Sequence, residues 1–318
     1  MKKFDILNEL DAIANYETPI VELIDPDNDI YIKKEDVIPF SFGGNKCRIA
    51  ANYFKEAVAG NHNVVVTYGA SSSNLCRVIA NMAARYGMKC VIVSPEENYV
   101  STPNSEMVLL LGAKIIKCPL NNVAETIDKV IADYKENNPY FIYGGGHGVQ
   151  GTDSYRCVLR QIIAFENAKN IKFDYIFITL ATGTSMSGLI VENEVGGYGK
   201  RLIGISIARE LSKAEEVMSN ALKEYDSEIS SKISKNYYTI LGDYRCEGYG
   251  TYTPEILKFI KKEFIINGLN LDTTYTGKAF FGMKDYLKRN NIQGKKILFI
   301  HTGGTPLFFK ENCSYLNH

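Results

Sequence analysis

The chain has 318 residues, of which 45% are hydrophobic and 23% are charged. This composition can bury a sizeable core, which excludes a disordered protein, and the length exceeds that of one typical domain, so we expect two domains. The 36 basic and 36 acidic side chains cancel, which argues against a protein that neutralises nucleic-acid phosphates. A small ligand, and no nucleic-acid partner, fits this balance.

The apolar segments and the cysteines indicate a soluble, cytoplasmic chain with no membrane partner. No run of about 18 apolar residues occurs, and no apolar signal segment precedes the early Asp5. The seven cysteines are odd in number, widely spread and form no CxxC pair, so most of them are expected to be reduced core residues. The four histidines show no metal-ligand spacing, and we predict no metal site.

Strands and helices are predicted to alternate along the chain. Apolar runs rich in Val, Ile and Phe predict strands, and the segments between them have helical periodicity. In chain order the sequence predicts a strand at 29–33, a helix at 46–59, a strand at 63–67, a helix at 74–87, a strand at 89–94, a helix at 105–112, a strand at 114–117, a helix at 121–136, a strand at 140–143, a helix at 152–167, a strand at 173–180, a helix at 185–195, a strand at 202–207, helices at 210–225, 253–267 and 277–289, and a strand at 296–301.

This alternation predicts the α/β class. Continuous apolar strands separated by helices form parallel sheets that are covered on both faces. The sequence has no internal repeat and no low-complexity linker. The domain boundary is therefore expected where the chain crosses between two sheets.

Three of the predicted strands end in loops rich in glycine and hydroxyl residues, at 68–74, 181–188 and 301–305. Ligands of open α/β sheets bind outside the carboxyl ends of the strands, so these loops predict a binding cleft. Residues 183–188 are a candidate phosphate cradle, because glycine lets the backbone approach an anion and the next helix offers unpaired N–H groups. Each loop alone is also compatible with an ordinary turn, and 183–188 matches neither the dinucleotide fingerprint nor a Walker loop.

A further glycine segment, Phe42-Gly43-Gly44-Asn45-Lys46, opens an amphipathic helix. The positive end of the helix dipole disfavours the charged form of Lys46 and so lowers its pKa. Only a neutral lysine amine attacks a carbonyl. A solvated surface lysine is the alternative, but beside a phosphate cradle Lys46 indicates pyridoxal 5′-phosphate (PLP), which carries a phosphate and an aldehyde.

The order of motifs along the chain resembles that of fold-type II PLP-dependent enzymes, and most of all the D-cysteine desulfhydrase and 1-aminocyclopropane-1-carboxylate (ACC) deaminase family. The resemblance covers about residues 15–310. Its motifs are Lys34-Glu35-Asp36, Gly43-Gly44-Asn45-Lys46 with Arg48, Ser73-Asn74 ahead of Arg77, Tyr143-Gly144-Gly145-Gly146 with Tyr155, residues 182–188, Tyr275-Thr276-Gly277-Lys278-Ala279 and His301-Thr302-Gly303-Gly304-Thr305.

The resemblance implies an α/β, tryptophan synthase β-like architecture of two open, twisted, mostly parallel sheets flanked by helices. It also implies a homodimer. Each subunit would have a large PLP-binding domain, residues 1–51 plus 159–318, and a small inserted domain, residues 52–158, with PLP in the cleft between them.

The resemblance further implies a role for individual residues. Lys46 would hold PLP covalently and then move the Cα proton, and Asn74 would hydrogen-bond the cofactor's phenolic oxygen. Thr302 would face the pyridine nitrogen, and because a hydroxyl does not keep that nitrogen protonated, the ring would be a weaker electron sink. The phosphate ligands would be Gly183, Thr184, Ser185 and Ser187, the substrate-carboxylate residues Ser71, Ser72 and Ser73, and the further catalytic or substrate-side residues Ser73, Tyr249 and Tyr275.

One position separates the two activities of the family. The deaminase pattern has glutamate directly after the tyrosine of the YxGK motif, whereas this chain has Thr276 after Tyr275, as the desulfhydrase pattern does. The implied reaction is α,β-elimination from a small amino acid, giving pyruvate, ammonia and a leaving group such as sulfide. Tyr275 and Tyr249 are also compatible with core aromatics whose hydroxyls are hydrogen-bonded.

The chain departs from the family pattern around the substrate. Ile49-Ala50-Ala51 replaces the usual Lys-Leu-Glu, Ser72 replaces a glutamine, and Leu75 replaces a histidine or glutamine. Because the Leu75 side chain neither donates nor accepts a hydrogen bond, any substrate contact or proton transfer from that position is lost. A PLP-dependent β-replacement transferase, an ACC deaminase and a non-catalytic PLP or amino-acid-binding protein therefore remain alternatives.

Overall fold

The computed structural model describes residues 2–96 and 99–312. This part of the chain contains two sheets, and it divides into two compact units around them. The first unit comprises the described residues of 1–16, 39–41 and 46–151. The second comprises those of 17–38, 42–45 and 152–318.

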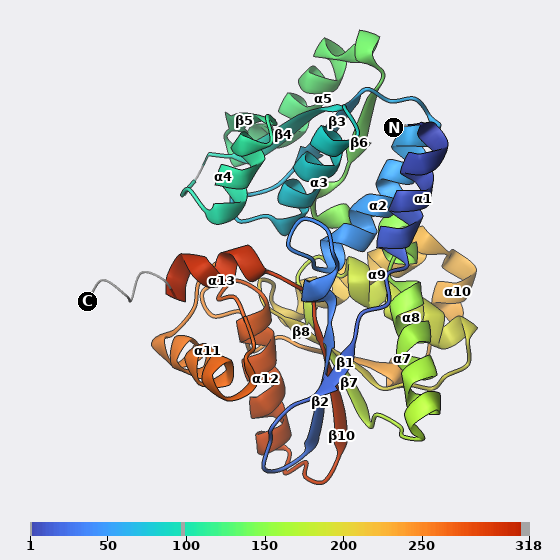
Figure 1. The fold of residues 1–318 in the computed structure, drawn as a ribbon. Helices are drawn as coiled ribbons and strands as arrows, with labels where there is room; N and C mark the ends of the chain where they lie inside the picture. Colours follow the sequence, from blue (N-terminus) through green and yellow to red (C-terminus); the bar gives the residue numbers. More distant parts are fainter. Residues whose placement is uncertain (1, 97–98, 313–318) are drawn as a thin grey trace. The chain divides into compact units, whose positions relative to one another are not determined.

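The first unit is built on a four-stranded parallel sheet in the order β5-β4-β3-β6. Val64 and Val66 of β3 pack with Val91 and Val93 of β4 against Val130 of α5, while α3 also packs on these two strands (Figure 1). The strands are β3 (Val64–Tyr68), β4 (Lys89–Pro95), β5 (Lys114–Cys118) and β6 (Pro139–Ile142). The helices of residues 2–133 are α1 (Lys3–Ala14), α2 (Asn45–Ala59), α3 (Asn74–Arg85), α4 (Pro103–Leu110) and α5 (Val123–Asp133).

The second unit is built on a six-stranded sheet in the order β1-β2-β10-β7-β8-β9, in which β1 is antiparallel to β2 and the other pairs are parallel. The strands are β1 (Ile20–Glu22), β2 (Asp29–Lys34), β7 (Tyr175–Leu180), β8 (Leu202–Ser206), β9 (Tyr238–Leu241) and β10 (Lys296–His301). The helices after residue 148 are α6 (Val149–Asp153), α7 (Arg156–Lys169), α8 (Thr184–Val195), α9 (Leu211–Tyr225), α10 (Ser227–Lys232), α11 (Pro254–Asn267), α12 (Thr276–Arg289) and α13 (Thr305–Asn312).

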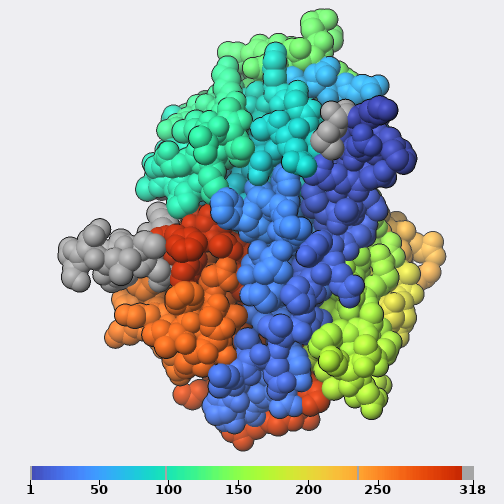
Figure 2. All heavy atoms as spheres, in the orientation of Figure 1, coloured from blue at the N-terminus to red at the C-terminus, as the bar shows by residue number. Residues whose placement is uncertain are grey.

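Both faces of this larger sheet are buried. Ile176 and Ile178 of β7 face a core shared with α7, α8 and α9, whereas Phe177 faces a core shared with α11 and α12. Successive side chains of a strand point to opposite faces, so a strand buried on both faces reads as a continuous apolar run. Figure 2 shows residues of the β1–β2 edge (blue) at the surface, with orange helical residues on one side and yellow-green ones on the other.

The predicted α/β class is confirmed, and each predicted strand and helix has a counterpart, although several ends differ by a few residues. The helix expected at 152–167 is divided into α6 and α7, and the strand expected from 173 begins at Tyr175. Elements β1, β9, α1, α10 and α13 were not predicted, although α1 has 12 residues and buries Leu10, Ile13 and Ala14. Strand β1 has only three residues, and the Ser227–Lys232 segment of α10 is polar. Neither segment therefore shows a recognisable hydrophobic periodicity.

The compact units do not have the limits predicted for the domains. The first unit extends beyond residues 52–158 at its N-terminal side, because Lys46 to Ala51 belong to the continuous helix α2 and Arg48 donates to the carbonyls of Ala14 and Tyr16. Compactness does not show which segments fold independently. The domain limits of 52–158 and of 1–51 plus 159–318 therefore stay a prediction.

Other sequence-based expectations concern membranes, metals and thiols. None of the helices in residues 2–96 and 99–312 is both long and apolar enough to cross a membrane, and the same residues contain no group of three His, Cys, Asp or Glu side chains placed to hold a metal ion. The described cysteines are free thiols, and Cys313 lies outside the described residues. Four are buried, namely Cys47, Cys76, Cys90 and Cys118.

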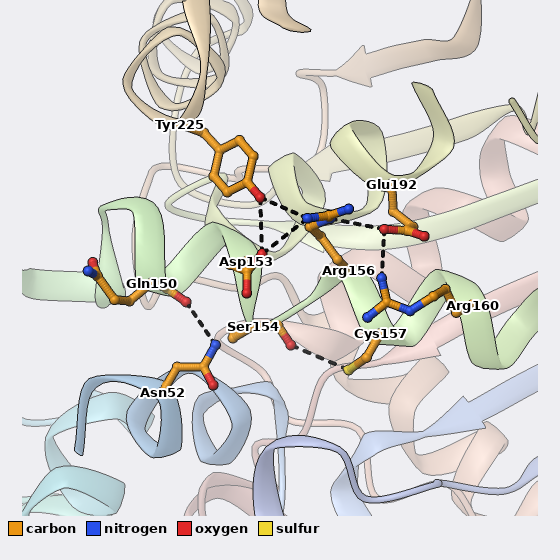
Figure 3. Close-up of polar contacts among 9 residues, drawn as sticks. All are labelled: Asn52, Gln150, Asp153, Ser154, Arg156, Cys157, Arg160, Glu192 and Tyr225. Atoms are coloured by element: carbon orange, nitrogen blue, oxygen red, sulfur yellow. Dashed lines mark hydrogen bonds and ion pairs between the residues drawn. The ribbon is translucent and has the colours of Figure 1, made fainter. Parts of the chain in front are cut away.

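Helix α8 is fixed in the second unit by a network of charges (Figure 3). The buried Glu192 near its end accepts from Arg156 Nε at 2.9 Å and from Arg160 at 2.7 Å, both on α7. Arg156 also contacts Asp153 at 3.3 Å and the Tyr225 hydroxyl at 3.0 Å. The network joins α6, α7, α8 and α9, so the C-terminal part of α8 is held against its neighbouring helices.

Gly188 in the first turns of α8 allows a close approach to the preceding helices. A Cβ at this position would lie 2.3 Å from the Thr152 carbonyl oxygen and 2.8 Å from the Tyr155 Cβ. We predict that Gly188→Ala lowers the free energy of unfolding by about 3 kcal/mol, because the overpacked atom meets backbone. Denaturant titration measures the loss.

Gly199→Ala is the matched control for this substitution. Gly199 has φ +63° and open space around its Cβ position, so alanine there adds only left-handed backbone strain, about 1 kcal/mol. Equal losses for the two variants would contradict the packing argument.

Candidate active site

The two glycine pairs that the sequence places far apart are in backbone contact within the second unit. A Cβ on Gly303 would lie 2.6 Å from Gly44 Cα, and one on Gly44 would lie 3.0 Å from the Thr302 carbonyl oxygen. Both glycines have positive φ, +101° at Gly44 and +109° at Gly303. Asn45 N–H donates to Thr302 O at 2.9 Å. Glycine is required at both places because the two backbones approach closely in a conformation that other residues avoid.

The predicted phosphate cradle begins α8. Gly183 is its N-cap in the left-handed conformation, with φ +85°, and Thr184 and Ser185 form the first turn, where helix N–H groups have no partner within the helix. Asn45 Nδ2 donates to Ser185 Oγ at 2.8 Å. Since this hydroxyl accepts from Asn45, its own proton can be donated to an anion. The N-terminus of α8 therefore has the donors that a phosphate needs.

Ser187, the fourth predicted phosphate ligand, differs from the other three. Like Thr184 and Ser185 it is buried, but its hydroxyl contacts Gly183 O at 3.2 Å and the Met218 sulfur at 3.9 Å. Its N–H donates to Gly183 O at 2.9 Å. Ser187 thus closes the first turn of the helix, and its contact with phosphate stays a prediction.

Lys46 is the second residue of α2 and belongs to the first unit. Its Nζ donates to the Gly145 carbonyl at 2.8 Å, in the Gly144–Gly146 turn. Burial lowers the pKa of Lys46 from 10.5 to about 8. The expected direction of the pKa shift is thus found, and loss of solvent around the buried amine accounts for it. Lys46 directly follows Asn45, the residue that contacts Ser185 of the predicted phosphate cradle.

The predicted substrate loop, Ser71 to Ser73, precedes α3. The Ser73 hydroxyl caps this helix by accepting from Cys76 N at 3.2 Å, and Ser73 N–H donates to Ala70 O at 2.9 Å. The carbonyl of Ser71 accepts from Thr102 Oγ1 at 2.5 Å. Ser73 is therefore engaged within the loop through its N–H, while its hydroxyl retains a proton to donate.

Asn74, the predicted partner of the phenolic oxygen, follows this loop as the first residue of α3. Its Oδ1 accepts from Asn104 Nδ2 at 3.0 Å and from Arg77 at 3.5 Å. The amide nitrogen is on the opposite edge of the group, so Asn74 presents a donor away from Asn104. A donor is what a phenolate oxygen requires.

The structure brings the two predicted tyrosines together. The Tyr249 and Tyr275 hydroxyls are hydrogen-bonded, and their rings meet edge to face at 5.7 Å between centroids. The buried Asp272 fixes Tyr275 at the start of α12 by accepting from its N–H at 2.7 Å. Burial raises the pKa of Asp272, while its hydrogen bonds from Thr276 and neighbouring N–H groups oppose that rise. The pair could therefore supply a hydroxyl proton to a substrate.

Lys278 of α12 holds the loop that carries Tyr249. Its side chain is fully buried, and its Nζ donates to the carbonyls of Ile207 at 3.0 Å, Arg245 at 3.1 Å and Gly248 at 2.9 Å. An ammonium has three protons, and each has a partner here. Lys278 thus joins the end of β8 to the residue before Tyr249.

Four of the departures from the family pattern lie at buried positions, whereas Ser72 is partly exposed. Ile49, Ala50, Ala51 and Leu75 are each at most 1% exposed. Thr276 is also buried, and its hydroxyl donates to Asp272 Oδ2 at 2.8 Å. The position that carries glutamate in the deaminase pattern is thus occupied by a residue that completes the Asp272 turn.

Sequence reasoning gave no role to Asn45, Asp272, Lys278 or Asn104. Asn45 lies in the Gly43–Lys46 motif and Lys278 in the Tyr275–Ala279 motif. The family resemblance therefore already indicated that both residues have a role. Asp272 precedes the YxGK motif by three residues, a spacing typical of a side chain that caps a helix. Asn104 follows Thr102-Pro103, which indicates a helix start and nothing further.

Comparison with known proteins identifies the class. The family model for pyridoxal-phosphate dependent enzymes matches residues 12–303. A D-cysteine desulfhydrase of Yersinia enterocolitica is 30% identical over 294 residues, 88% of each chain, and a 1-aminocyclopropane-1-carboxylate deaminase of Bradyrhizobium sp. is 29% identical over 307 residues, 91% of this chain and 90% of that one. A solved ACC deaminase homologue has 28% identity and a TM-score of 0.82, covering 98% of both chains.

The chain belongs to the pyridoxal-phosphate dependent enzyme family, with the fold-type II architecture and PLP as its cofactor. Its residues fit that cofactor. A lysine with a lowered pKa can react with the aldehyde, and a glycine-capped helix N-terminus with a hydroxyl oriented by Asn45 suits the phosphate. The predicted recognition of this family is confirmed.

The Lys278 contacts give a testable consequence for stability. Lys278→Met keeps the length of the side chain but leaves three buried carbonyls without their donor. We predict a loss of about 3 kcal/mol in the free energy of unfolding, measured by urea denaturation. Lys213→Met is the control, because Lys213 pairs with Glu216 on an exposed surface and such pairs contribute about 0.5 kcal/mol. A loss for Lys278→Met no larger than that of the control would refute the role given to Lys278.

Proposed function

We propose that the protein is a lyase that removes the α-proton and a Cβ leaving group from a small amino acid, as a D-cysteine desulfhydrase does. The products would be pyruvate, ammonia and a leaving group such as sulfide. The similarity to a D-cysteine desulfhydrase and to ACC deaminases over about nine tenths of the chain supports this class of reaction. Bound PLP would supply the electron sink for loss of the α-proton.

The observation that carries the proposal is the environment of Lys46. Its amine has one carbonyl acceptor among the described residues, Gly145 O at 2.8 Å, and a pKa lowered to about 8. Near neutral pH an appreciable fraction of such an amine is unprotonated and can accept a proton. Lys46 would therefore hold the cofactor and move the substrate's α-proton.

The other predicted site residues would serve the same cofactor and substrate. Gly183, Thr184, Ser185 and Ser187 would bind the phosphate. Thr302 would face the pyridine nitrogen, and its position is supported by its carbonyl contact with Asn45. The loop of Ser71, Ser72 and Ser73 would bind the substrate carboxylate, and the hydrogen-bonded pair Tyr249 and Tyr275 would face the substrate.

The contacts of Thr276 favour elimination over opening of a cyclopropane ring. Its hydroxyl is bonded to Asp272, and a glutamate in its place would bring a second carboxylate against that buried group. The apolar Leu75 removes one further acid or base from the substrate loop. Both features support a substrate whose leaving group departs once the α-proton is lost.

We also propose a homodimer and a cytoplasmic location. A dimer is supported by the family resemblance and by exposed apolar side chains on α11 and α13, where Phe264, Ile265 and Phe309 are 47%, 73% and 54% exposed. A cytoplasmic location is supported by the free thiols of the six described cysteines, which suit a reducing compartment.

The role of Lys46 predicts the site of covalent PLP attachment. Borohydride treatment of the holoenzyme is expected to fix PLP to the peptide containing Lys46, and the rate of PLP attachment to apoenzyme is expected to rise with pH and level off above about 8, as the amine becomes neutral. Lys46→Ala should lose both the label and turnover.

Lys55→Ala is the control for this experiment, since Lys55 is on the same helix and pairs with Asp11. This variant should keep the label. A label on another lysine would overturn the assignment of Lys46, and a wild-type protein that binds no PLP would remove the whole proposal.

The reaction class predicts the outcome of a substrate panel. Purified enzyme is incubated with D-cysteine, L-cysteine, β-chloroalanine, D-serine and ACC, each with and without an added thiol. Pyruvate is expected from at least one β-substituted amino acid without thiol, and no 2-oxobutyrate, the four-carbon product of ring opening, from ACC. Product that forms only when thiol is present would instead identify a β-replacement transferase.

A further inference from the structure

Asn104 of α4 is a fully buried polar residue that the cofactor and substrate motifs do not include. Its Nδ2 donates to two acceptors on the neighbouring segment, Ser72 O at 2.9 Å and Asn74 Oδ1 at 3.0 Å. Helices α3 and α4 pack together in the first unit (Figure 1). Asn104 therefore contacts both the predicted substrate loop and the predicted partner of the phenolic oxygen.

The hydrogen bonds of Asn104 fix which way its own amide is turned. The acceptor on Ser72 is a backbone carbonyl, which cannot donate, so the Asn104 atom facing it must be the nitrogen. The Oδ1 of Asn104 is buried and accepts no hydrogen bond from the described residues. The bonds through Nδ2 are thus formed although the oxygen on the other edge lacks a partner.

The orientation of the Asn104 amide also determines that of the Asn74 amide. Because Asn104 Nδ2 is a donor, the Asn74 atom that meets it must be the oxygen, and Arg77, which has only donors, contacts the same oxygen at 3.5 Å. The Asn74 nitrogen is left on the opposite edge and donates to none of the described residues. Ser72 O therefore sets the orientation of Asn104, which in turn sets that of Asn74.

We infer that Asn104 is a positioning residue for the cofactor, which acts by holding the Asn74 amide with its NH2 edge ready to donate to the phenolic oxygen of PLP. The inference rests on the proposed function, which assigns that contact to Asn74. It requires Asn104 to act through the direction of a hydrogen bond. A purely structural link between α3 and α4 would require only that some contact be present.

Two substitutions of similar size separate these roles. Asn104→Asp replaces the donor by an acceptor. Asn74 then gains a hydrogen bond by turning its NH2 edge toward position 104, which directs that edge away from the cofactor. Asn104→Leu removes the donor without reversing the polarity, and Arg77 still holds Asn74 Oδ1. Thr102→Val is the matched control, because it deletes the bond to Ser71 O and the cap of α4 while leaving the contacts of Asn74 intact.

The measurement is the apparent Kd of PLP, obtained by titrating apoprotein and following the visible absorption of bound cofactor, with thermal unfolding of each apoprotein beside it. We expect Asn104→Asp to raise the Kd about tenfold or more, as loss of a hydrogen bond to a charged acceptor does. Asn104→Leu should raise it less, and Thr102→Val should destabilise the apoprotein with little change in the Kd.

A double-mutant cycle completes the test. In an Asn74→Ala background neither Asn104→Asp nor Asn104→Leu should weaken PLP binding further, because the effect passes through Asn74. An unchanged Kd for Asn104→Asp, an equal effect of Thr102→Val, or additive losses in the double variants would each overturn the inference while leaving PLP binding by the wild type in place. If Asn104→Asp does not fold, Asn104→Leu alone with Asn74→Ala gives the same cycle.

Discussion

The contact between the Gly43–Gly44 and Gly303–Gly304 backbones is the constraint on which the candidate site depends. A Cβ atom at Gly44 or Gly303 would lie 3.0 or 2.6 Å from the facing backbone. The loop after β10 and the segment before α2 can therefore approach each other this closely only because both positions are glycine. This approach places Asn45 where its N–H reaches Thr302 O and its side chain reaches Ser185. The segment that leads into Lys46 is thereby tied to the start of α8, and the charge network around Glu192 holds the far end of that helix.

Two lysines of the family motifs, Lys46 and Lys278, have different surroundings, and these suit one to a reactive role and the other to a structural role. Lys278 is buried with three carbonyl acceptors, one for each ammonium proton. Lys46 has one carbonyl acceptor among the described residues, and burial lowers its pKa to about 8. Burial lowers the pKa of Lys278 as well, but three carbonyls accept from its ammonium, whereas a single carbonyl of the described residues accepts from Lys46. The number of acceptors therefore distinguishes the supporting lysine from the reactive one.

The fold was largely predictable because both faces of its strands are buried. Continuous runs such as Ile176 to Leu180 are recognisable without a partner sequence, and β-α alternation then limits the topology. Two of the elements that were not predicted have a weak hydrophobic pattern, because β1 has only three residues at a sheet edge and α10 has no buried residues. The limits of the compact units were not readable either, since α2 runs without a break across the boundary between Asn45 and Lys46.

The site residues that could be predicted from the sequence are those whose chemistry allows only one or a few residue types. A group that reacts with an aldehyde must be an amine, and a backbone that approaches an anion or another backbone must be glycine, so Lys46, Gly183 and Gly303 stand out in the sequence. The residues that orient these groups need only the right hydrogen-bond polarity. Asn104 meets that need by donating to a carbonyl and an amide oxygen, and Asp272 by accepting from three successive N–H groups. Several side chains satisfy such a requirement at many spacings, so their role becomes visible only when their partners' positions are known.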